Sequence, residues 1–240
     1  MLDGLTQTLS KRILANGGNV MFIGHYGAAF AARAVKPAIP LWQLFVAVQL
    51  VDFAWAGLVL AGIEKFDVAP GFMEASILDL HHMPYTHSLV AAVIWAIAAG
   101  VLYAALRRGA KAMTAGIIIG VAVFSHWLTD LIAHGPDLAL WFGGPKVGLG
   151  LWNSLLWTQV VEIGLLLIGG ALYLAHTKPK GLIGRIAPWL LIGFMLALQV
   201  YNHLPVDHPP AIPQFAIMAL IAFSLLAFLA WAADRTRVPA

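Results

Sequence analysis

Three acidic side chains stand inside long apolar runs of this sequence. Asp52, Asp130 and Glu162 lie in stretches made otherwise almost entirely of aliphatic, aromatic and small residues. An ionised side chain near the centre of a bilayer costs about 2.5–3.5 kcal/mol, so such groups need a compensating partner. No lysine or arginine lies within these runs. The missing positive charge is most simply a metal ion.

Histidines stand at spacings that suit the same metal. His126 and Asp130 are four residues apart, so a helix would project both to one side. His82 and His87 precede the apolar run that begins at Ser88, and His25 lies in a short apolar stretch. Imidazole and carboxylate ligands without cysteine favour a catalytic Zn²⁺, with Mn²⁺ or Fe²⁺ as alternatives, over a closed structural zinc site. The candidate metal ligands are His25, Asp52, His82, His87, His126 and Asp130.

Two of the acidic residues are also candidates for catalysis. Glu162 could accept a proton from a metal-activated water, ligate the metal, or remain a buried protonated acid. Asp52 would complete or orient the ligand shell. For His126 and Asp130, the alternative to metal ligation is a hydrogen-bonded polar pair between helices. Other polar residues are expected to be bystanders or solvated: His81, His134, His203, Asp207 and His208.

The composition indicates which scaffold positions these residues. Of the 240 residues, 61% are hydrophobic and only 10% are charged, whereas soluble domains carry about 25% charged residues. Six apolar runs approach the roughly 20 residues that cross a hydrocarbon core as a helix. They are Leu41–Ile63, Ser88–Leu106, Ala112–Ile132, Leu151–Ala175, Ile186–Leu204 and Gln214–Ala233. With the shorter stretch Val20–Val35, the sequence predicts an all-α polytopic membrane protein with about seven transmembrane helices.

The N-terminal segment has a different pattern. Leucine and isoleucine recur on one helical face of residues 1–16, and Gly17 and Gly18 end the pattern. This predicts a short interfacial amphipathic helix over residues 1–18, followed by a single transmembrane helical domain over residues 19–240. A signal peptide is the alternative, since Lys11 and Arg12 precede an apolar stretch.

The distribution of cations predicts the orientation. Of the 14 lysine and arginine residues, ten follow the first, third, fifth and seventh predicted helices. The positive-inside rule therefore places these loops in the cytoplasm. The candidate histidines then lie in the outer half of the bilayer, so we expect the metal site to face outward.

The order of these motifs resembles a known family. Gly24-His25, Val51-Asp52, His82-x4-His87-Ser88 and His126-x3-Asp130 follow one another as in the membrane-bound metal-dependent hydrolases of the bacterial inner membrane, one member of which is regulated by the SOS repressor LexA. The resemblance covers roughly residues 20–135. The chain lacks the second acid of that family's Pro-Asp-x-Asp pattern and the Arg-Gly pair of its His-Arg-Gly-x-Thr-His-Ser pattern.

The order of ligands is also similar to a second group, the helical fold of zinc-dependent phospholipase C and single-strand nucleases. There a histidine usually stands four residues before the helical glutamate, where this chain has Thr158 before Glu162. Both resemblances imply metal-activated water that attacks an ester, usually a phosphoester.

Together these features predict a membrane-embedded metal-dependent hydrolase that acts on an ester or phosphoester of a lipid-like substrate from the outer side of the bacterial inner membrane. The sequence shows no arginine fork near the site, so both ester classes stay open. A secondary transporter or ion pathway that uses the buried Asp, Glu and His is the alternative. A haem protein would leave the carboxylates unexplained. The absence of a dense basic face argues against a nucleic-acid partner, and the absence of cysteine excludes thiolate sites.

Overall fold

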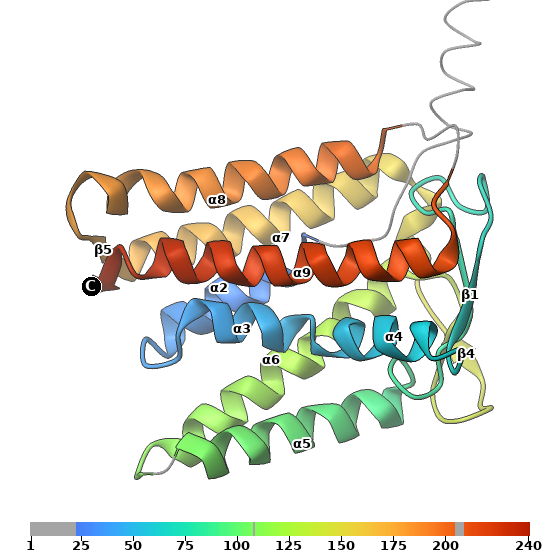
Figure 1. Ribbon diagram of the computed structural model, residues 1–240, viewed down its shortest axis with the longest axis horizontal. Helices are drawn as coiled ribbons and strands as arrows, with labels where there is room; N and C mark the ends of the chain where they lie inside the picture. Colours follow the sequence, from blue (N-terminus) through green and yellow to red (C-terminus); the bar gives the residue numbers. More distant parts are fainter. Residues whose placement is uncertain (1–22, 108, 205–208) are drawn as a thin grey trace, which may run out of the picture.

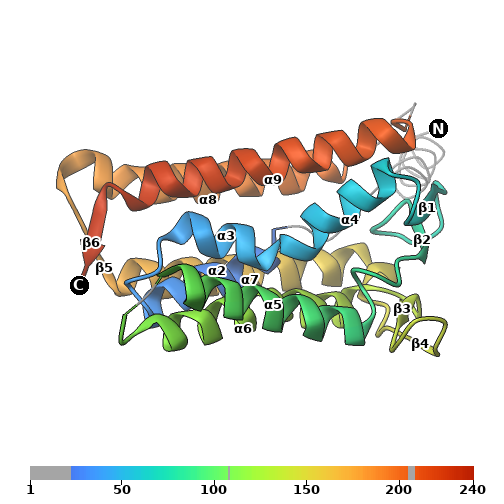
Figure 2. The same cartoon turned by 60° about the horizontal axis from the view of Figure 1, so that its bottom comes forward.

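The computed structural model describes residues 23–107, 109–204 and 209–240, and this part of the protein is mostly helical (Figure 1). Five helices are long and apolar enough to cross a membrane: α5 (Leu89–Arg107), α6 (Ala112–Ala133), α7 (Leu155–Ala175), α8 (Gly181–Asn202) and α9 (Ile212–Asp234). They extend along the long axis of the molecule (Figures 1 and 2). Each overlaps a predicted apolar run, which confirms a mostly helical protein and agrees with a membrane-embedded one.

The predicted helix over residues 41–63 is broken near its middle. Its two parts, α3 (Leu41–Val48) and α4 (Leu50–Leu60), are bent by 52° at Gln49. The side-chain amide of Gln49 donates to Oδ2 of Asp52 over 3.2 Å. The break also sets the carbonyl of Val48 against His126, whose Nδ1 lies 2.7 Å away. Counted as one span, the bent pair raises the number of spans to six.

Helix α2 (His25–Val35) is shorter than the predicted first span. Its 11 residues extend about 16 Å, roughly half of a hydrocarbon core. The described residues therefore contain five spans, or six with the bent pair, rather than about seven. The predicted interfacial helix over residues 1–18 and residues 20–22 of the first apolar stretch lie outside the described residues.

Glycines allow α5 and α6 to pack closely. A Cβ added to Gly116 of α6 would collide with the carbonyl of Gly100 of α5, and Gly120 approaches the carbonyl of Ala96 in the same way. Small residues at such interfaces let helix backbones approach each other within lipid. The indole of Trp127 in α6 donates to the carbonyl of His87 over 3.0 Å. The segment before α5 is thereby held against the second half of α6.

Short two-stranded sheets, which the all-α expectation did not include, lie at both ends of the bundle (Figures 1 and 2). At one end, β1 (Lys65–Val68) pairs with β2 (Leu78–His82), and β3 (Leu138–Ala139) pairs with β4 (Lys146–Val147). The short 3-10 helix η1 (Leu151–Asn153) follows them. We call this the hairpin end. At the other end, β5 (Thr177–Pro179) pairs with β6 (Arg237–Pro239).

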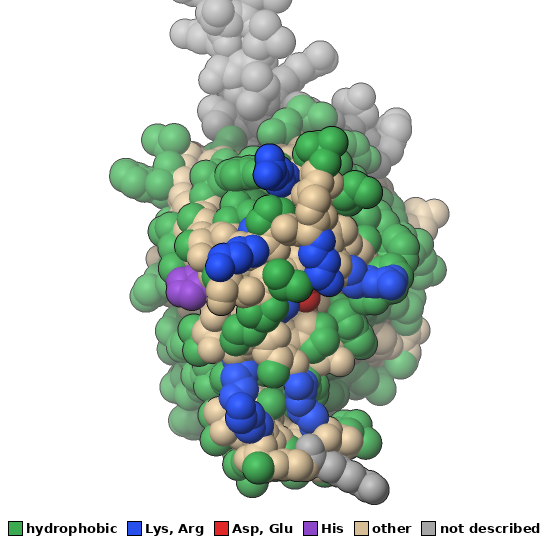
Figure 3. Space-filling view, turned by 90° about the vertical axis from the view of Figure 1, so that its left-hand side faces the viewer, with side chains coloured by type: hydrophobic (Ala, Val, Ile, Leu, Met, Phe, Trp, Pro, Cys, Tyr) green, Lys and Arg blue, Asp and Glu red, His purple; other side chains and the backbone are tan. Residues whose placement is uncertain are grey.

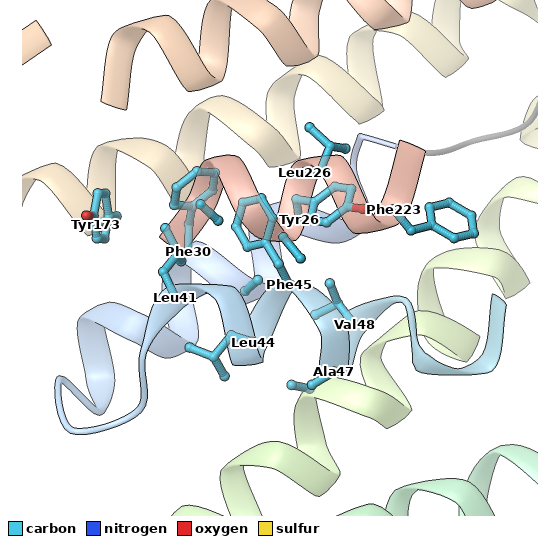
Figure 4. Close-up of a cluster of buried hydrophobic side chains, with 14 of the residues drawn as sticks. Tyr26, Phe30, Leu41, Leu44, Phe45, Ala47, Val48, Tyr173, Phe223 and Leu226 are labelled. Atoms are coloured by element: carbon cyan, nitrogen blue, oxygen red, sulfur yellow. The ribbon is translucent and has the colours of Figure 1, made fainter. Parts of the chain in front are cut away.

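The main apolar core lies between α2, α3, α7 and α9 (Figure 4). Phe30 of α2 packs edge-on against Phe45 of α3, with ring centroids 5.2 Å apart. It also contacts Tyr173 of α7 at 5.4 Å. The ring centroids of Tyr26 and Phe45 are 4.5 Å apart. These contacts hold α2 in the bundle and so fix its first residue, His25.

Lysine and arginine side chains gather at the end that carries β5 and β6 (Figure 3). The surface members are Lys36, Arg107, Lys111, Lys178, Lys180, Arg185 and Arg235. We call this the cationic end. Two cations of the same loops, Arg33 and Arg237, are instead buried. Arg33 pairs with Asp234, an acid of this end, at 3.1 Å. The clustering of the surface cations agrees with the predicted charge asymmetry of the loops.

Candidate metal centre

Five of the six predicted metal ligands lie together toward the hairpin end. His25 begins α2, Asp52 lies in the first turn of α4, and His87 stands two residues before α5. His126 and Asp130 lie in the last two turns of α6, about 10 and 5 Å from its end at 1.5 Å per residue. Four segments that are distant in sequence therefore meet at one place.

Asp130 lies at the centre of this cluster. Its Oδ2 is 3.1 Å from Nε2 of His126 and 3.5 Å from Nε2 of His87. Its Oδ1 is 3.1 Å from Nε2 of His25. Asp52 adds its Oδ1, which is 3.2 Å from Nε2 of His87 and 3.5 Å from Nε2 of His126. Two groups of potential ligand atoms result, His25–His126–Asp130 and Asp52–His87–His126.

The cluster is closed off almost completely. His25, His87, His126 and Asp130 are each at most 4% exposed. The side chain of Asp52 is 15% exposed. Burying a carboxylate is costly unless it is paired or coordinates a metal. Asp52 is therefore the least buried member of the cluster.

A backbone carbonyl fixes the tautomer of His126. Its Nδ1 lies 2.7 Å from the carbonyl oxygen of Val48, which can only accept, so Nδ1 carries the proton. In a neutral ring, Nε2 then presents a lone pair to Asp130. Both Nε2 and Oδ2 of Asp130 are buried, and neither makes a hydrogen bond within the described residues although they lie 3.1 Å apart. A cation shared between Nε2 and Oδ2 would satisfy both atoms, and it can be either a proton that makes the ring an imidazolium or a metal ion.

The hydroxyl of Thr86 fixes the proton of His87 on Nδ1, as the Val48 carbonyl does for His126. The hydroxyl of Thr86 donates to Oε2 of Glu64 over 2.7 Å, so its oxygen accepts from Nδ1 of His87, also 2.7 Å away. The lone pair of His87 Nε2 then faces Asp52. Both imidazoles therefore turn Nε2 toward the carboxylates, where a proton or a metal ion can be shared between nitrogen and oxygen.

The spacing of the cluster fits a metal ion. Ligand atoms bound about 2.0–2.1 Å from a tetrahedral Zn²⁺ lie roughly 3.3 Å from one another. The imidazole–carboxylate contacts around His87 and His126 span 3.1–3.5 Å. The second nitrogen of each of these rings is held by a neighbouring acceptor, which is the usual arrangement of metal-binding histidines. The residues present therefore fit a divalent ion.

His134 lies beside the cluster, although its position at a helix end predicted a solvated side chain. It is 2% exposed, with Nδ1 2.8 Å from Asp137 and Nε2 3.7 Å from Oδ1 of Asp130. Burial opposes its protonation, but the carboxylates of Asp137 and Asp130 outweigh burial and raise the pKa of His134. The prediction was wrong because η1 covers this end of α6, with the Trp152 ring centroid 4.2 Å from that of His134. The spacing of four residues after Asp130 was the signal that could have found it.

Two predicted site residues lie apart from the cluster. His82 is exposed at the end of β2, opposite Lys65 of β1, and belongs to neither group of ligand atoms. Glu162 is fully buried on α7 and also lies outside both groups. However, α7 packs against α2, where a Cβ on Gly27 would collide with the backbone of Leu165, one turn from Glu162. Glu162 therefore lies on the helix that neighbours the one carrying His25.

The histidines outside the cluster differ in how exposed they are. His81 is exposed, as expected. His203 is partly buried at the end of α8, where its Nδ1 lies 2.8 Å from the carbonyl of Gln199. Asp207 and His208 lie outside the described residues.

Comparison with known proteins identifies no family. The chain matches no protein-family model, no curated protein and no solved structure. The resemblances noted above therefore rest on the quoted motifs, and the site is interpreted from its own chemistry.

Proposed function

We propose that the protein is a membrane-embedded metal-dependent hydrolase. It would bind a divalent ion, Zn²⁺ foremost and Mn²⁺ or Fe²⁺ as alternatives, and cleave an ester or phosphoester of a lipid-like amphiphile. The observation that carries the proposal is the orientation of His87 and His126, whose Nε2 atoms face the partly buried carboxylate of Asp52 and the buried carboxylate of Asp130. Such a set is costly to bury unless a cation completes it.

The residues of the cluster would share the work of binding. The ion would be held by Asp52, His87, His126 and Asp130, whose contacts have the spacing of metal ligands. His25 would complete the shell or hold Asp130 through its other oxygen. A divalent ion supplies a Lewis acid there and makes a bound water more acidic. Asp52, the most exposed of the five, would face the entering water and substrate.

Glu162 is the proposed proton acceptor. It is fully buried on α7, next to the helix that begins with His25. A carboxylate in this position could take the proton that water loses and pass it to the leaving group. Glu162→Gln tests this role, because the amide keeps the shape of the side chain but cannot take up the proton.

An apolar groove supports a lipid-like substrate. It has a volume of about 520 Å³ and lies between the bent span and α9, with Trp42, Phe53 and Trp231 among its lining residues. Phe53 directly follows Asp52, so the wall of the groove and the metal centre share the first turn of α4. Pockets of this size hold molecules of several hundred daltons. An acyl chain in the groove would bring its ester toward Asp52.

The two ends of the molecule support access from the outer side of a bacterial inner membrane. By the positive-inside rule the cationic end would face the cytoplasm, and the hairpin end with the metal centre would face outward. Cysteine labelling tests this in a chain that contains no cysteine. A membrane-impermeant maleimide should label Asp67→Cys in intact cells and Lys180→Cys only after permeabilisation. The reverse result would place substrate access in the cytoplasm.

One observation favours a second function, an ion or proton pathway. The break between α3 and α4 lies directly beside the buried carboxylates, and broken helices form the ion sites of many transporters. A pathway of this kind would give a proton or cation flux in proteoliposomes that Asp130→Asn abolishes. It would give no lipid product.

The decisive experiment is incubation of the purified, metal-loaded protein with a mixed bacterial lipid extract, followed by mass spectrometry. Wild type should release a cleaved lipid. His126→Ala should release none, and Glu162→Gln should be slower by about 10²–10⁴-fold, the usual contribution of a general base. His176→Ala is a matched control, because His176 is exposed near the cationic end.

The outcomes separate the parts of the proposal. If wild type leaves every lipid unchanged with metal bound, the lipid-hydrolase function is wrong and transport becomes the better explanation. If Glu162→Gln cleaves as fast as wild type while His126→Ala is inactive, the metal centre stands and the assignment of the proton acceptor is wrong.

A further inference from the structure

Glu64 is a buried acid that the proposed function does not use. It lies between α4 and β1 and is 1% exposed. Its Oε1 accepts from the backbone N–H groups of Tyr85 and Thr86, over 2.8 and 3.0 Å. Its Oε2 accepts from the hydroxyl of Thr86 over 2.7 Å. These three hydrogen bonds stabilise the ionised form of the Glu64 carboxylate.

This carboxylate sets the direction of a hydrogen-bond chain. A carboxylate can only accept, so the Thr86 hydroxyl must donate to Glu64 and its oxygen is left to accept from His87. Nδ1 of His87 then carries a proton, and Nε2, which lies 3.2 Å from Oδ1 of Asp52, is the nitrogen that can bind a cation. If Thr86 donated to Nδ1 instead, the proton would lie on Nε2 and would point into the metal centre.

We propose that Glu64 is a positioning residue that holds His87 in its metal-binding tautomer by acting through Thr86. The inference rests on the proposed metal centre, which it deepens. Glu64 itself does not touch the centre, because Thr86 and His87 lie between them. Through this chain the start of the β1–β2 hairpin is linked to the chemistry of the site.

Glu64→Gln should reverse the direction of the Glu64–Thr86–His87 hydrogen bonds with little change in side-chain shape. The amide oxygen can still accept from the backbone N–H groups of Tyr85 and Thr86. The amide NH₂ group, however, donates toward the Thr86 hydroxyl oxygen, so the hydroxyl turns to donate to Nδ1 of His87. The variant therefore retains the local packing and favours the wrong tautomer.

Zinc titration against a chromophoric chelator tests the consequence for binding. Glu64→Gln and Thr86→Val should each weaken zinc binding by about 10–100-fold, the usual cost of losing a group that orients a metal ligand. Thr86→Ser keeps the hydroxyl and should bind as wild type does. Glu74→Gln is the matched control, because Glu74 is an exposed acid of the same end that accepts from the backbone N–H of Leu155 over 3.0 Å. Unfolding of the metal-free proteins shows separately whether a variant has lost stability.

A second measurement reports the tautomer without metal. In protein labelled with ¹⁵N-histidine, the His87 signals, assigned by their loss in His87→Ala, should show the Nδ1–H form in wild type and the Nε2–H form in Glu64→Gln. Equal zinc affinity of Thr86→Val and Thr86→Ser, or an unchanged tautomer in Glu64→Gln, would overturn the inference. If wild type binds no zinc, the proposed metal centre fails, and the tautomer measurement still decides whether Glu64 controls His87.

Discussion

Two buried charged clusters lie toward opposite ends of the molecule and differ in how their charges are matched. At the cationic end, Arg33 donates to Asp234 over 3.1 Å and to the carbonyl of Pro37 over 2.7 Å. Asp234 also accepts from the hydroxyl of Tyr173 over 3.0 Å and from the backbone N–H of Leu41 over 3.2 Å. Each charge of this cluster has a partner of opposite sign within the chain.

The charges of the proposed metal centre have fewer partners of opposite sign. The Nδ1–H groups of His87 and His126 have acceptors in Thr86 and Val48, and their Nε2 atoms face the carboxylates of Asp52 and Asp130, with which no lysine or arginine of the described residues pairs. Burial of charge is common to both clusters and so does not mark a functional site. The proposed metal centre differs in that only histidines, among the described residues, form ion pairs with its carboxylates, and this is the feature that supports a bound ion.

Removal of the metal should have the largest effect on stability. An ion present at about 1,000 times its Kd stabilises the folded state by about 4.1 kcal/mol, so a chelator should lower the unfolding free energy of wild type by about that amount. His126→Ala should already lack most of this stabilisation, and a chelator should change it little. Unfolding in detergent, with and without chelator, measures both. Equal responses of the two proteins would contradict a metal held by His126.

Breaking the Arg33–Asp234 pair should lower the unfolding free energy by a slightly smaller amount, and this loss should not depend on metal. Asp234→Asn leaves the charge of Arg33 buried without its carboxylate, which should cost about 3 kcal/mol. Metal content and the response to chelator should stay as in wild type. The control is Asp67→Asn, an exposed acid, for which a change of at most about 0.5 kcal/mol is expected. Loss of metal from the Asp234 variant would show that the two clusters are coupled.

Loosening the packing of α5 on α6 should weaken zinc binding at the proposed metal centre without affecting the Arg33–Asp234 cluster. Gly116→Ala places a Cβ against the carbonyl of Gly100, and such overpacking costs about 1–3 kcal/mol. The shift of α5 should also weaken zinc binding, since His87 lies two residues before this helix. Gly193→Ala on α8 meets only open space and should leave both stability and zinc affinity intact. Zinc titration and unfolding of the two variants provide the comparison, and similar zinc affinities would show that the centre tolerates a displaced α5.

The sequence was most informative where the relevant pattern is local. Apolar length alone predicts the spans α5 to α9, because crossing a bilayer requires a fixed number of residues. Likewise, the spacing of His126 and Asp130 predicts a shared helix face, since residues four apart are neighbours on any helix. A carboxylate inside an apolar run predicts a partner whatever the tertiary structure is.

The sequence was least informative where burial comes from distant segments. The break at Gln49 places Val48 against His126, which no periodicity signals. Similarly, His134 and Glu64 lie between predicted helices and are nevertheless buried. The 3-10 helix η1 packs over His134, and the segment around Thr86 packs over Glu64. Such coverage depends on how segments at the hairpin end fold back on the bundle.

The smallest effect is expected for His82, which the sequence alone did not distinguish from His87. The two histidines are five residues apart, but His82 is exposed at the end of β2 and His87 is buried against Asp52. His82→Ala should therefore change stability by less than about 0.5 kcal/mol and zinc affinity by less than about twofold, whereas His87→Ala should lose tight zinc binding. Paired zinc titrations of the two variants measure this contrast. A loss of zinc from His82→Ala as large as that from His87→Ala would mean that the β1–β2 hairpin closes over the ion and supplies a ligand from its exposed edge.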